Sequence, residues 1–302
     1  MLPALPQRET TSSRDPRWPG AANIAVQFVL NYEEGAENSV LDGDPASETF
    51  LSEIIGAQGF TDRHMSMESL YEYGSRAGLW RLLRVFERRA LPLTVFGVAM
   101  ALARNPDAVG AFLARGDEIA CHGLRWLSYQ QIAPEVERRH LAEAVALMTE
   151  LTGAAPLGWY TGRDSPQTRH LVVEHGGFLY DRDYLGDELP FWIKYGKRDH
   201  LVIPFSFETN DNRFDQNHGF STADEFATYL SDCFDLLYEE GADAPKLMSI
   251  SLHDRLIGRP AKAVGLIRFL DHARKHDRVW FCTGKDIAEH WRRTHPPHNA
   301  EG

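Results

Sequence analysis

AVQFVLNYEEG, residues 25–35, is a short apolar run that ends in two adjacent carboxylates. Residues 24–30 are mostly apolar and rich in β-branched and aromatic side chains, which is typical of a buried strand. In α/β folds the reacting groups lie at the carboxyl ends of strands, so Glu33 and Glu34 stand where a substrate could be held. Adjacent carboxylates repel each other, and we expect one of them to have a raised pKa, as a general base near neutral pH needs. An isolated Glu-Glu pair is more often an acidic surface loop, and only the rest of the chain can decide.

The composition is that of an ordinary globular protein with an acidic balance. The chain has 302 residues, of which 43% are hydrophobic and 25% are charged, which is ample for a large core. Single α/β barrels commonly take about 250 residues, so we expect one domain. Asp and Glu outnumber Lys and Arg by 43 to 32, for a formal charge of −11. No Lys/Arg cluster is interleaved with aromatic residues, and we therefore expect no nucleic-acid partner.

The cysteines and the hydropathy pattern indicate the compartment. Cys121, Cys233 and Cys282 lie far apart and in no CxxC spacing, which predicts neither a disulfide framework nor a cysteine zinc site. No apolar run reaches the length of a signal-peptide core or a membrane span, so we expect a cytoplasmic protein with no membrane contact. We divide the chain into a flexible leader at residues 1–20, a catalytic domain at 21–297 and a tail at 298–302.

Strand and helix patterns alternate over nearly the whole length. Strands are expected at residues 24–30, 93–98, 118–121, 157–160, 178–180, 200–205, 247–252 and 279–281. Helices are expected at residues 67–89, 106–115, 134–151, 165–175, 221–240, 260–275 and 283–293, the fifth opening with a capping box over Ser221 to Asp224. This alternation predicts parallel βα units closed into a barrel. The long polar segment at residues 36–63 is expected to be a lid or a contact surface.

Acid, base and cation candidates follow these strands. In a barrel they would all face one mouth: Glu33, Glu34, His122, Tyr160, Arg163, Asp181, Asp183 and His253. A lone histidine after a strand is more often structural than catalytic. A base for water, an acid for the leaving group and a cation for the oxyanion are nevertheless what a hydrolytic site needs, and the convergence favours one here.

The ordered motifs NYEEG, CHGLRW, YTGRDSP and SLHD resemble those of the polysaccharide deacetylase superfamily, whose fold is a distorted (β/α) barrel. In that superfamily the first motif supplies a general base and a metal ligand, and the second supplies two histidine ligands four residues apart. A late Leu-His strand end supplies the general acid. The resemblance implies that Glu33 is the base, Glu34 and His122 stand at ligand positions, Arg163 is the third-motif arginine and His253 is the acid.

The departures from the superfamily pattern concern the metal. Trp126 stands where a metal-binding member has its second histidine, and an indole cannot ligate a metal. Aspartates are also lengthened to glutamates. Catalytic zinc normally takes three protein ligands and a water, and only Glu34 and His122 remain. We therefore expect no metal cofactor and vestigial ligand positions at Glu34, His122 and Trp126, with zinc at Glu34 and His122 as the alternative.

A wider motif set is similar to the cofactor-independent bacterial allantoinases of this superfamily, and the cyclic-imide hydrolases share much of it. It includes MSMESLYEYGSRAG, GWYTGR, LYDRD, LVIPF, TNDNRF and LHDRLIGRP. The resemblance implies opening of a ring amide, such as allantoin to allantoate in purine catabolism, with Glu33 activating water and His253 protonating the ring nitrogen. The alternatives are a cyclic imide hydrolase, a polysaccharide deacetylase, or a binding module with a decayed site. The family precedent also implies a homo-oligomer, with a tetramer as the expected form.

The remaining candidates have supporting roles. Arg163, His122 or backbone N–H groups are expected to stabilise the oxyanion. Substrate contacts are also expected from Glu34, Trp126, Tyr160 and Asp183, and Asp181 and Asp183 are further candidates for orienting Arg163 or His253. Glu68, Tyr71, Tyr73 and Arg76 form a polar helix face for solvent or a second subunit. Residues 36–63 are where we expect substrate choice to be encoded.

Overall fold

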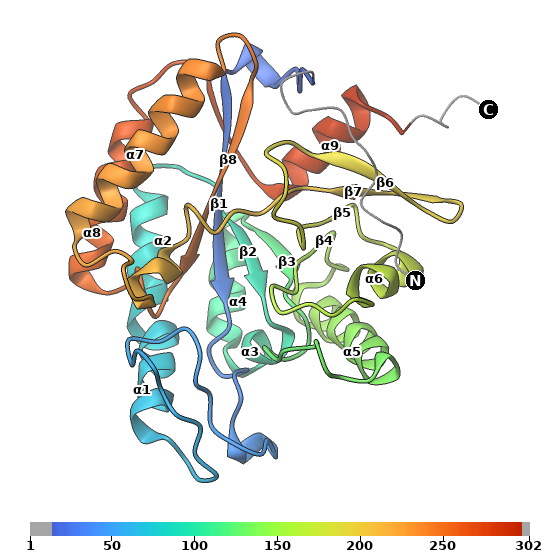
Figure 1. Cartoon of the computed structure of the whole chain (residues 1–302), viewed down its shortest axis with the longest axis vertical. Coiled ribbons are helices and arrows are strands. Elements are labelled where there is room, and N and C mark those ends of the chain that lie inside the picture. Colours follow the sequence, from blue (N-terminus) through green and yellow to red (C-terminus); the bar gives the residue numbers. More distant parts are fainter. Residues whose placement is uncertain (1–13, 298–302) are drawn as a thin grey trace.

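A computed structural model describes residues 14–297 of the chain. Within this range one nine-stranded sheet has the order β6-β7-β5-β4-β3-β2-β1-β8, and β9 pairs with β1 outside that path (Figure 1). The strands are β1 (Ile24–Tyr32), β2 (Thr94–Gly97), β3 (Glu118–Cys121), β4 (Gly158–Trp159), β5 (Tyr180–Asp181), β6 (Phe191–Tyr195), β7 (Arg198–Val202), β8 (Lys246–His253) and β9 (Val279–Cys282). The α-helices are α1 (Met65–Tyr73), α2 (Leu79–Glu87), α3 (Ala99–Arg104), α4 (Pro106–Arg115), α5 (Pro134–Thr152), α6 (Thr168–His175), α7 (Ala223–Glu240), α8 (Pro260–Ala273) and α9 (Gly284–Thr294).

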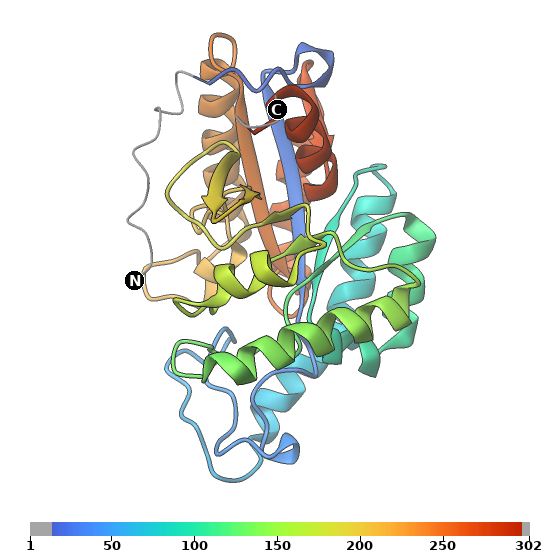
Figure 2. The same cartoon turned by 90° about the vertical axis from the view of Figure 1, so that its right-hand side faces the viewer.

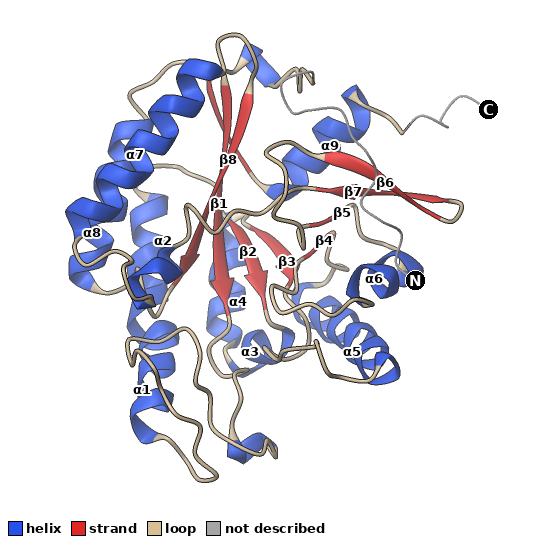
Figure 3. Cartoon of the chain, viewed as in Figure 1, coloured by secondary structure: helices blue, strands red, loops and turns tan. Residues whose placement is uncertain are grey.

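β1 is the centre of the sheet because three parallel strands pair with it. β8 pairs along almost its whole length, from Ile24 opposite Lys246 to Asn31 opposite His253. On the other edge β9 pairs with the first half of β1 and β2 with the second half. Both edges of β1 are therefore paired, and all of its residues are buried, which explains its nearly continuous apolar sequence. The same pairing brings the carboxyl ends of β1, β2 and β8 together (Figure 3).

Alternate residues of β1 serve two cores. Val26, Phe28 and Leu30 are fully or almost fully buried in the layer that includes residues of α2, α7 and α8. Ala25 and Val29 belong to a second buried cluster inside the barrel, with Phe96, Tyr160 and Tyr180 among its members. Because side chains alternate across a strand, Asn31 and Glu33 continue the inward row toward the mouth.

The barrel is distorted because β7 and β8 do not pair. β7 ends in an antiparallel hairpin with β6, a strand that the sequence did not predict. After β7 the chain passes beside β8 at an isolated parallel bridge between Asn210 and Ser251, with Ser251 N donating to Thr209 O at 3.1 Å, and only then enters η5 and α7. Figure 2 shows the molecule from the side, with the β6–β7 hairpin in front of the long strands β1 and β8. The predicted fold class, a distorted (β/α) barrel of the polysaccharide deacetylase type, is confirmed.

Several predicted boundaries hold and others are corrected. The helix at Pro106–Arg115 and the strand at Glu118–Cys121 are found as predicted. The capping box before α7 is formed by Thr222 and Glu225, one residue later than expected, because the Thr222 side chain accepts from Glu225 N. The expected helix at 67–89 is interrupted by a π-helical turn, η4 (Gly74–Gly78). The short helix α3 was not predicted.

The prediction of a flexible leader over residues 1–20 is wrong for the residues from 14 onward. Trp18 is 3% exposed and packs beside Trp291, and its Nε1 donates to Lys246 O at 2.8 Å. Pro16 O is hydrogen-bonded to His290 Nε2. This segment therefore packs on the barrel, while residues 1–13 and 298–302 lie outside the described range. Among the described helices, none has the length and apolar character to cross a membrane.

Candidate active site

A cavity of about 390 Å³ opens at the carboxyl ends of the strands. Its wall includes most of the predicted site residues, namely Glu33, His122, Trp126, Tyr160, Arg163 and His253. They come from strand ends or from the loops that follow β1, β3, β4 and β8, which is where parallel topology gathers side chains. The structure thus brings together residues more than 200 positions apart in the sequence.

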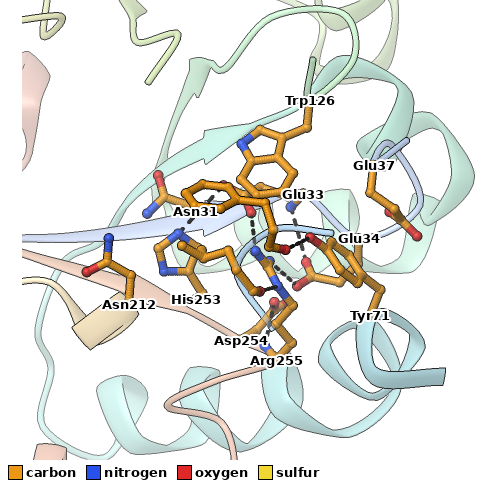
Figure 4. A network of polar contacts seen from close by, with 12 residues as sticks. Asn31, Glu33, Glu34, Glu37, Tyr71, Trp126, Asn212, His253, Asp254 and Arg255 are labelled. Atoms are coloured by element: carbon orange, nitrogen blue, oxygen red, sulfur yellow. Dashed lines mark hydrogen bonds and ion pairs between the residues drawn. The ribbon is translucent and has the colours of Figure 1, made fainter. Parts of the chain in front are cut away.

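Glu33 lies close to Arg255 and His253 (Figure 4) and to His122. Its Oε1 is 3.2 Å from His122 Nε2 and 3.6 Å from His253 Nε2, and its Oε2 accepts from Arg255 Nη2 at 2.6 Å. Burial alone would raise the pKa of Glu33, but the positive charges of Arg255 and His253 together outweigh it and hold the pKa well below the usual range. Glu33 is therefore ionised at neutral pH. The expectation that repulsion between the two carboxylates raises the pKa of one of them is not met at Glu33, because Arg255 lies against both carboxylates.

His253 is held by Asp211, a residue that sequence reasoning missed. Asp211 Oδ1 is 2.6 Å from His253 Nδ1, and Asp211 Oδ2 accepts the His253 backbone N–H at 2.7 Å. Burial lowers the pKa of His253, but the carboxylates of Asp211 and Glu33 more than offset it and raise the pKa to about 9. The imidazole is consequently protonated at neutral pH, with Nε2 on the side of Glu33. Asp211 lies in η5 (Asp211–Asp215), and the only signal for it was the polar run TNDNRF.

Arg255 is a second residue that was not predicted, although it follows His253 by two positions in LHDR. It is 2% exposed, and its Nη1 donates to Glu34 Oε1 at 2.9 Å while Nη2 binds Glu33. Its Nε donates to Leu51 O at 2.9 Å, and its guanidinium lies 4.4 Å from the centre of the Tyr71 ring. One buried arginine therefore pairs with both glutamates and also anchors the segment 36–63. Tyr71 is buried here, not on a surface face as expected.

The contacts of His122 define which ring nitrogen carries a proton. Nδ1 is 2.7 Å from Tyr160 O, and a carbonyl oxygen only accepts, so Nδ1 is the donor. The other nitrogen, Nε2, consequently faces Glu33 and the cavity. The Tyr160 ring stacks on the imidazole with centroids 5.0 Å apart and planes inclined by 8°. His122 is thus fixed in orientation by one residue, Tyr160, from the neighbouring strand end.

Aromatic and cationic side chains form the outer wall. The Trp126 ring stacks with Phe50 at 5.8 Å, and the Arg163 guanidinium lies 4.6 Å from the Trp126 ring centre. Arg163 Nη1 donates to Trp126 O at 2.9 Å, so Arg163 is part of this wall. Phe50 and Leu51 also line the cavity, which confirms that the segment 36–63 shapes the pocket.

Glu34 and Asp183 are not among the residues that line the cavity, and their predicted substrate contacts are corrected. Glu34 binds Arg255 and accepts the Glu33 backbone N–H at 3.1 Å. Asp183 accepts the backbone N–H groups of Thr161 and Gly162, at 3.0 and 2.8 Å. Burial, followed by the negative charges of Asp164 and Asp181, raises the pKa of Asp183 to about 8. Asp183 therefore shapes the loop that carries Arg163.

Asp181, the other candidate for orienting Arg163 or His253, binds different residues. Its carboxylate binds Arg169 and His200, at 3.0 and 2.8 Å. Burial would raise the pKa of Asp181, but Arg169 and His200 together hold it well below the usual range. Asp181 consequently forms its own ion pair at the end of β5.

The residues at the superfamily's metal position do not fit a divalent ion. An indole stands at one ligand position, and Glu34 is turned toward Arg255. The Arg255 guanidinium binds both Glu33 and Glu34, so a metal there would meet a positive charge at hydrogen-bond distance from its ligands. Elsewhere in residues 14–297, ligand atoms of Asp235 on α7, His272 on α8 and His276 just after α8 lie within 4.8 Å of one another, outside the cavity wall.

Comparison with known proteins agrees with this geometry. The family profile for polysaccharide deacetylase matches residues 62–172. A Schizosaccharomyces pombe protein that carries a provisional name as a polysaccharide deacetylase is 40% identical over 92% of this chain and 93% of its own length. The crystal structure of a probable polysaccharide deacetylase from Pseudomonas aeruginosa PAO1 is 57% identical, with a TM-score of 0.93, over 94% of this chain and 96% of that chain. The crystal structure of Puue allantoinase is 53% identical, with a TM-score of 0.94, over 97% of this chain and 100% of that chain. Since identity at this level extends over almost the whole length, the chain belongs to the polysaccharide deacetylase family and is a hydrolase that acts on carbon–nitrogen bonds.

Proposed function

We propose that the protein opens the ring amide of a small cyclic ureide, converting allantoin to allantoate by acid–base catalysis without a metal. The observation that carries the proposal is the pair formed by Glu33 and His253, an ionised carboxylate and a protonated imidazole 3.6 Å apart on the wall of one cavity. General base and general acid are then in the required protonation states at the same pH. The identity of 53% with Puue allantoinase supports a ureide as the substrate.

In the first step Glu33 removes a proton from a water molecule, and the hydroxide attacks the ring carbonyl carbon. His253 then donates its Nε2 proton to the ring nitrogen as the carbon–nitrogen bond breaks, which leaves a carboxylic acid and an N–H group. The proton held by Glu33 can return to His253 because Oε1 and Nε2 are 3.6 Å apart. The acid product loses its proton to solvent, and both groups are restored.

The oxyanion needs positive charge or N–H donors near the carbonyl oxygen. The Arg163 guanidinium is the side-chain donor that we assign to it, since Arg163 lines the cavity, and backbone N–H groups are the further candidates. A carboxylate with a lowered pKa is a weak base, so Glu33 depends on a substrate that is already electrophilic. Carbonyl groups of cyclic ureides and imides meet that requirement better than an acetamide does.

The shape of the site favours a small substrate, and its charge favours a reaction without a metal. A cavity of about 390 Å³ has the size expected for a small ligand, and Phe50 and Trp126 stack across part of its wall. Arg255 supplies the positive charge beside Glu33 that a metal ion supplies in metal-dependent relatives. A cyclic imide hydrolase is the second candidate, because the acid–base pair serves an imide carbonyl equally well.

The test is hydrolysis of allantoin, succinimide, maleimide and dihydrouracil by the purified protein after exhaustive chelation. We expect allantoin turnover to persist after chelation and to fall at least about 100-fold in Glu33→Gln and in His253→Ala, the usual scale for acid–base groups. Turnover lost on chelation and restored by zinc would refute the metal-independent mechanism. Acetate release from N-acetylglucosamine oligomers, without ring opening, would refute the ring-amide assignment.

A further inference from the structure

We infer that Asn31 and Asn212 form an acceptor pair that binds substrate N–H groups and selects ureides over imides. The inference rests on the proposed ring-amide hydrolysis and names the group that the site recognises. Both residues line the cavity, and they are only 1% and 7% exposed. Figure 4 shows their amides beside the His253 ring, where the departing ring nitrogen must lie to receive its proton.

The orientation of the Asn31 amide is fixed by β8. Its Nδ2 donates to Leu252 O at 3.2 Å and to Ser251 Oγ at 2.8 Å. A carbonyl oxygen cannot donate, so the NH₂ group must face Leu252 and Oδ1 must be the free end of the amide. Within residues 14–297, Asn31 Oδ1 is buried and has no hydrogen-bond partner.

Asn212 presents a second acceptor on a rigid segment. Its backbone N–H donates to Asn210 Oδ1 at 2.8 Å, and the preceding residue, Asp211, is bonded to both His253 N and His253 Nδ1. Its Oδ1 is also buried without a partner among the described side chains and backbone groups. The same short helix, η5, therefore positions the catalytic imidazole and an acceptor beside it.

Two buried acceptors without partners are costly unless something donates to them. A ureide such as allantoin carries N–H groups on both ring nitrogens and on its exocyclic ureido group, so it can donate to both asparagines. A cyclic imide has a single N–H between two carbonyl oxygens, and those oxygens would face other acceptors. Sites that bind a substrate N–H reject analogues that lack it, because the acceptor is then left unpaired.

The experiment compares kcat/KM for allantoin, hydantoin and succinimide in the wild type and in Asn212→Leu, which keeps the side-chain size and removes the acceptor. We expect kcat/KM for allantoin to fall at least about tenfold, mainly through KM, and that for succinimide to change less than about threefold. Gln216→Leu is the matched control, since Gln216 is an exposed amide on the same wall, and we expect it to change all three substrates by the same factor.

Asn31→Leu should shift the same ratio. Because Asn31→Leu also removes the hydrogen bonds to β8, its thermal unfolding is measured as well. In a separate experiment, the dissociation constants of hydantoin and succinimide are measured with the inactive Glu33→Gln protein. If the Glu33→Gln protein binds succinimide more weakly than hydantoin, the result supports the inference. An equal loss for all substrates in Asn212→Leu would overturn it. Wild-type turnover of succinimide but not of ureides would also overturn it and leave ring-amide chemistry intact, whereas no turnover of any ring amide would refute the proposed function itself.

Discussion

The substitution Asp211→Asn should remove the positive charge of the general acid, His253, and leave the position of its ring unchanged. In the native protein the Asp211 carboxylate accepts from both His253 N and Nδ1, and it helps to raise the pKa of His253 to about 9. An asparagine keeps the shape but loses the charge. Its carbonyl oxygen can accept the backbone N–H, and its NH₂ then faces Nδ1, which must become an acceptor. His253 is consequently left neutral, with its remaining proton on Nε2.

The magnitude follows from the two pKa values. With a pKa of about 9, roughly nine-tenths of His253 is protonated at pH 8. If the pKa of His253 falls to the unperturbed value of about 6.5, only about 3% is protonated there, a loss of about 30-fold. A neutral imidazole is also a weaker proton donor than an imidazolium, so we expect kcat to fall by about 30-fold or more at pH 8. Below neutral pH part of the activity should return.

The assay is the pH dependence of kcat/KM for allantoin between about pH 5 and 10. In the wild type we expect a plateau through neutral pH, since the lowered pKa keeps Glu33 ionised, and a decline as pH rises through about 9. In Asp211→Asn the decline should move at least about one unit lower. Asp215→Asn is the control, because Asp215 lies in the same short helix η5 and its carboxylate has no hydrogen-bond partner among residues 14–297, and its decline should move less than that of Asp211→Asn. An unchanged alkaline decline in Asp211→Asn would refute the assignment of His253 as an acid charged by Asp211.

Two further substitutions test the buried framework behind the site. Arg255→Met leaves the carboxylates of Glu33 and Glu34 without the cation between them. We expect the free energy of unfolding, measured by urea titration, to fall by about 3–5 kcal/mol. A fall of less than about 1 kcal/mol would contradict the role of Arg255. Gly78→Ala puts a Cβ against the backbone carbonyl oxygen of Asp254, and we expect the free energy of unfolding to fall by about 1–3 kcal/mol. The control is Gly110→Ala in α4, where a Cβ has open space, and this change should not destabilise the protein.

Local patterns were strong enough to predict most of the fold. The apolar run of β1 is buried on both faces, as its sequence indicates, and Asn105 with Pro106 and Gly116 marks both ends of α4. Thr283 caps α9 as predicted, because a hydroxyl followed by an acidic residue three positions later is a local signal. The strand β6 and the interruption of the first long helix were missed. The strand β6 pairs with β7, the next strand along the chain, whereas the interruption of the helix lies against the backbone of Asp254, a distant segment.

The sequence by itself determined which residues stand at strand ends and therefore which of them can reach one cavity, since alternation and parallel topology are properties of the local pattern. It identified Glu33, His122, Trp126, Tyr160, Arg163 and His253 on the wall. Only the tertiary structure decided how these groups are charged. Arg255 binds Glu34 and lowers the pKa of Glu33, which is opposite to the raised pKa expected for a general base. Asp211 raises the pKa of His253. The reason is that a pKa depends on burial and on charges within a few ångströms, and those neighbours come from segments that the spacing of residues along the chain does not bring together.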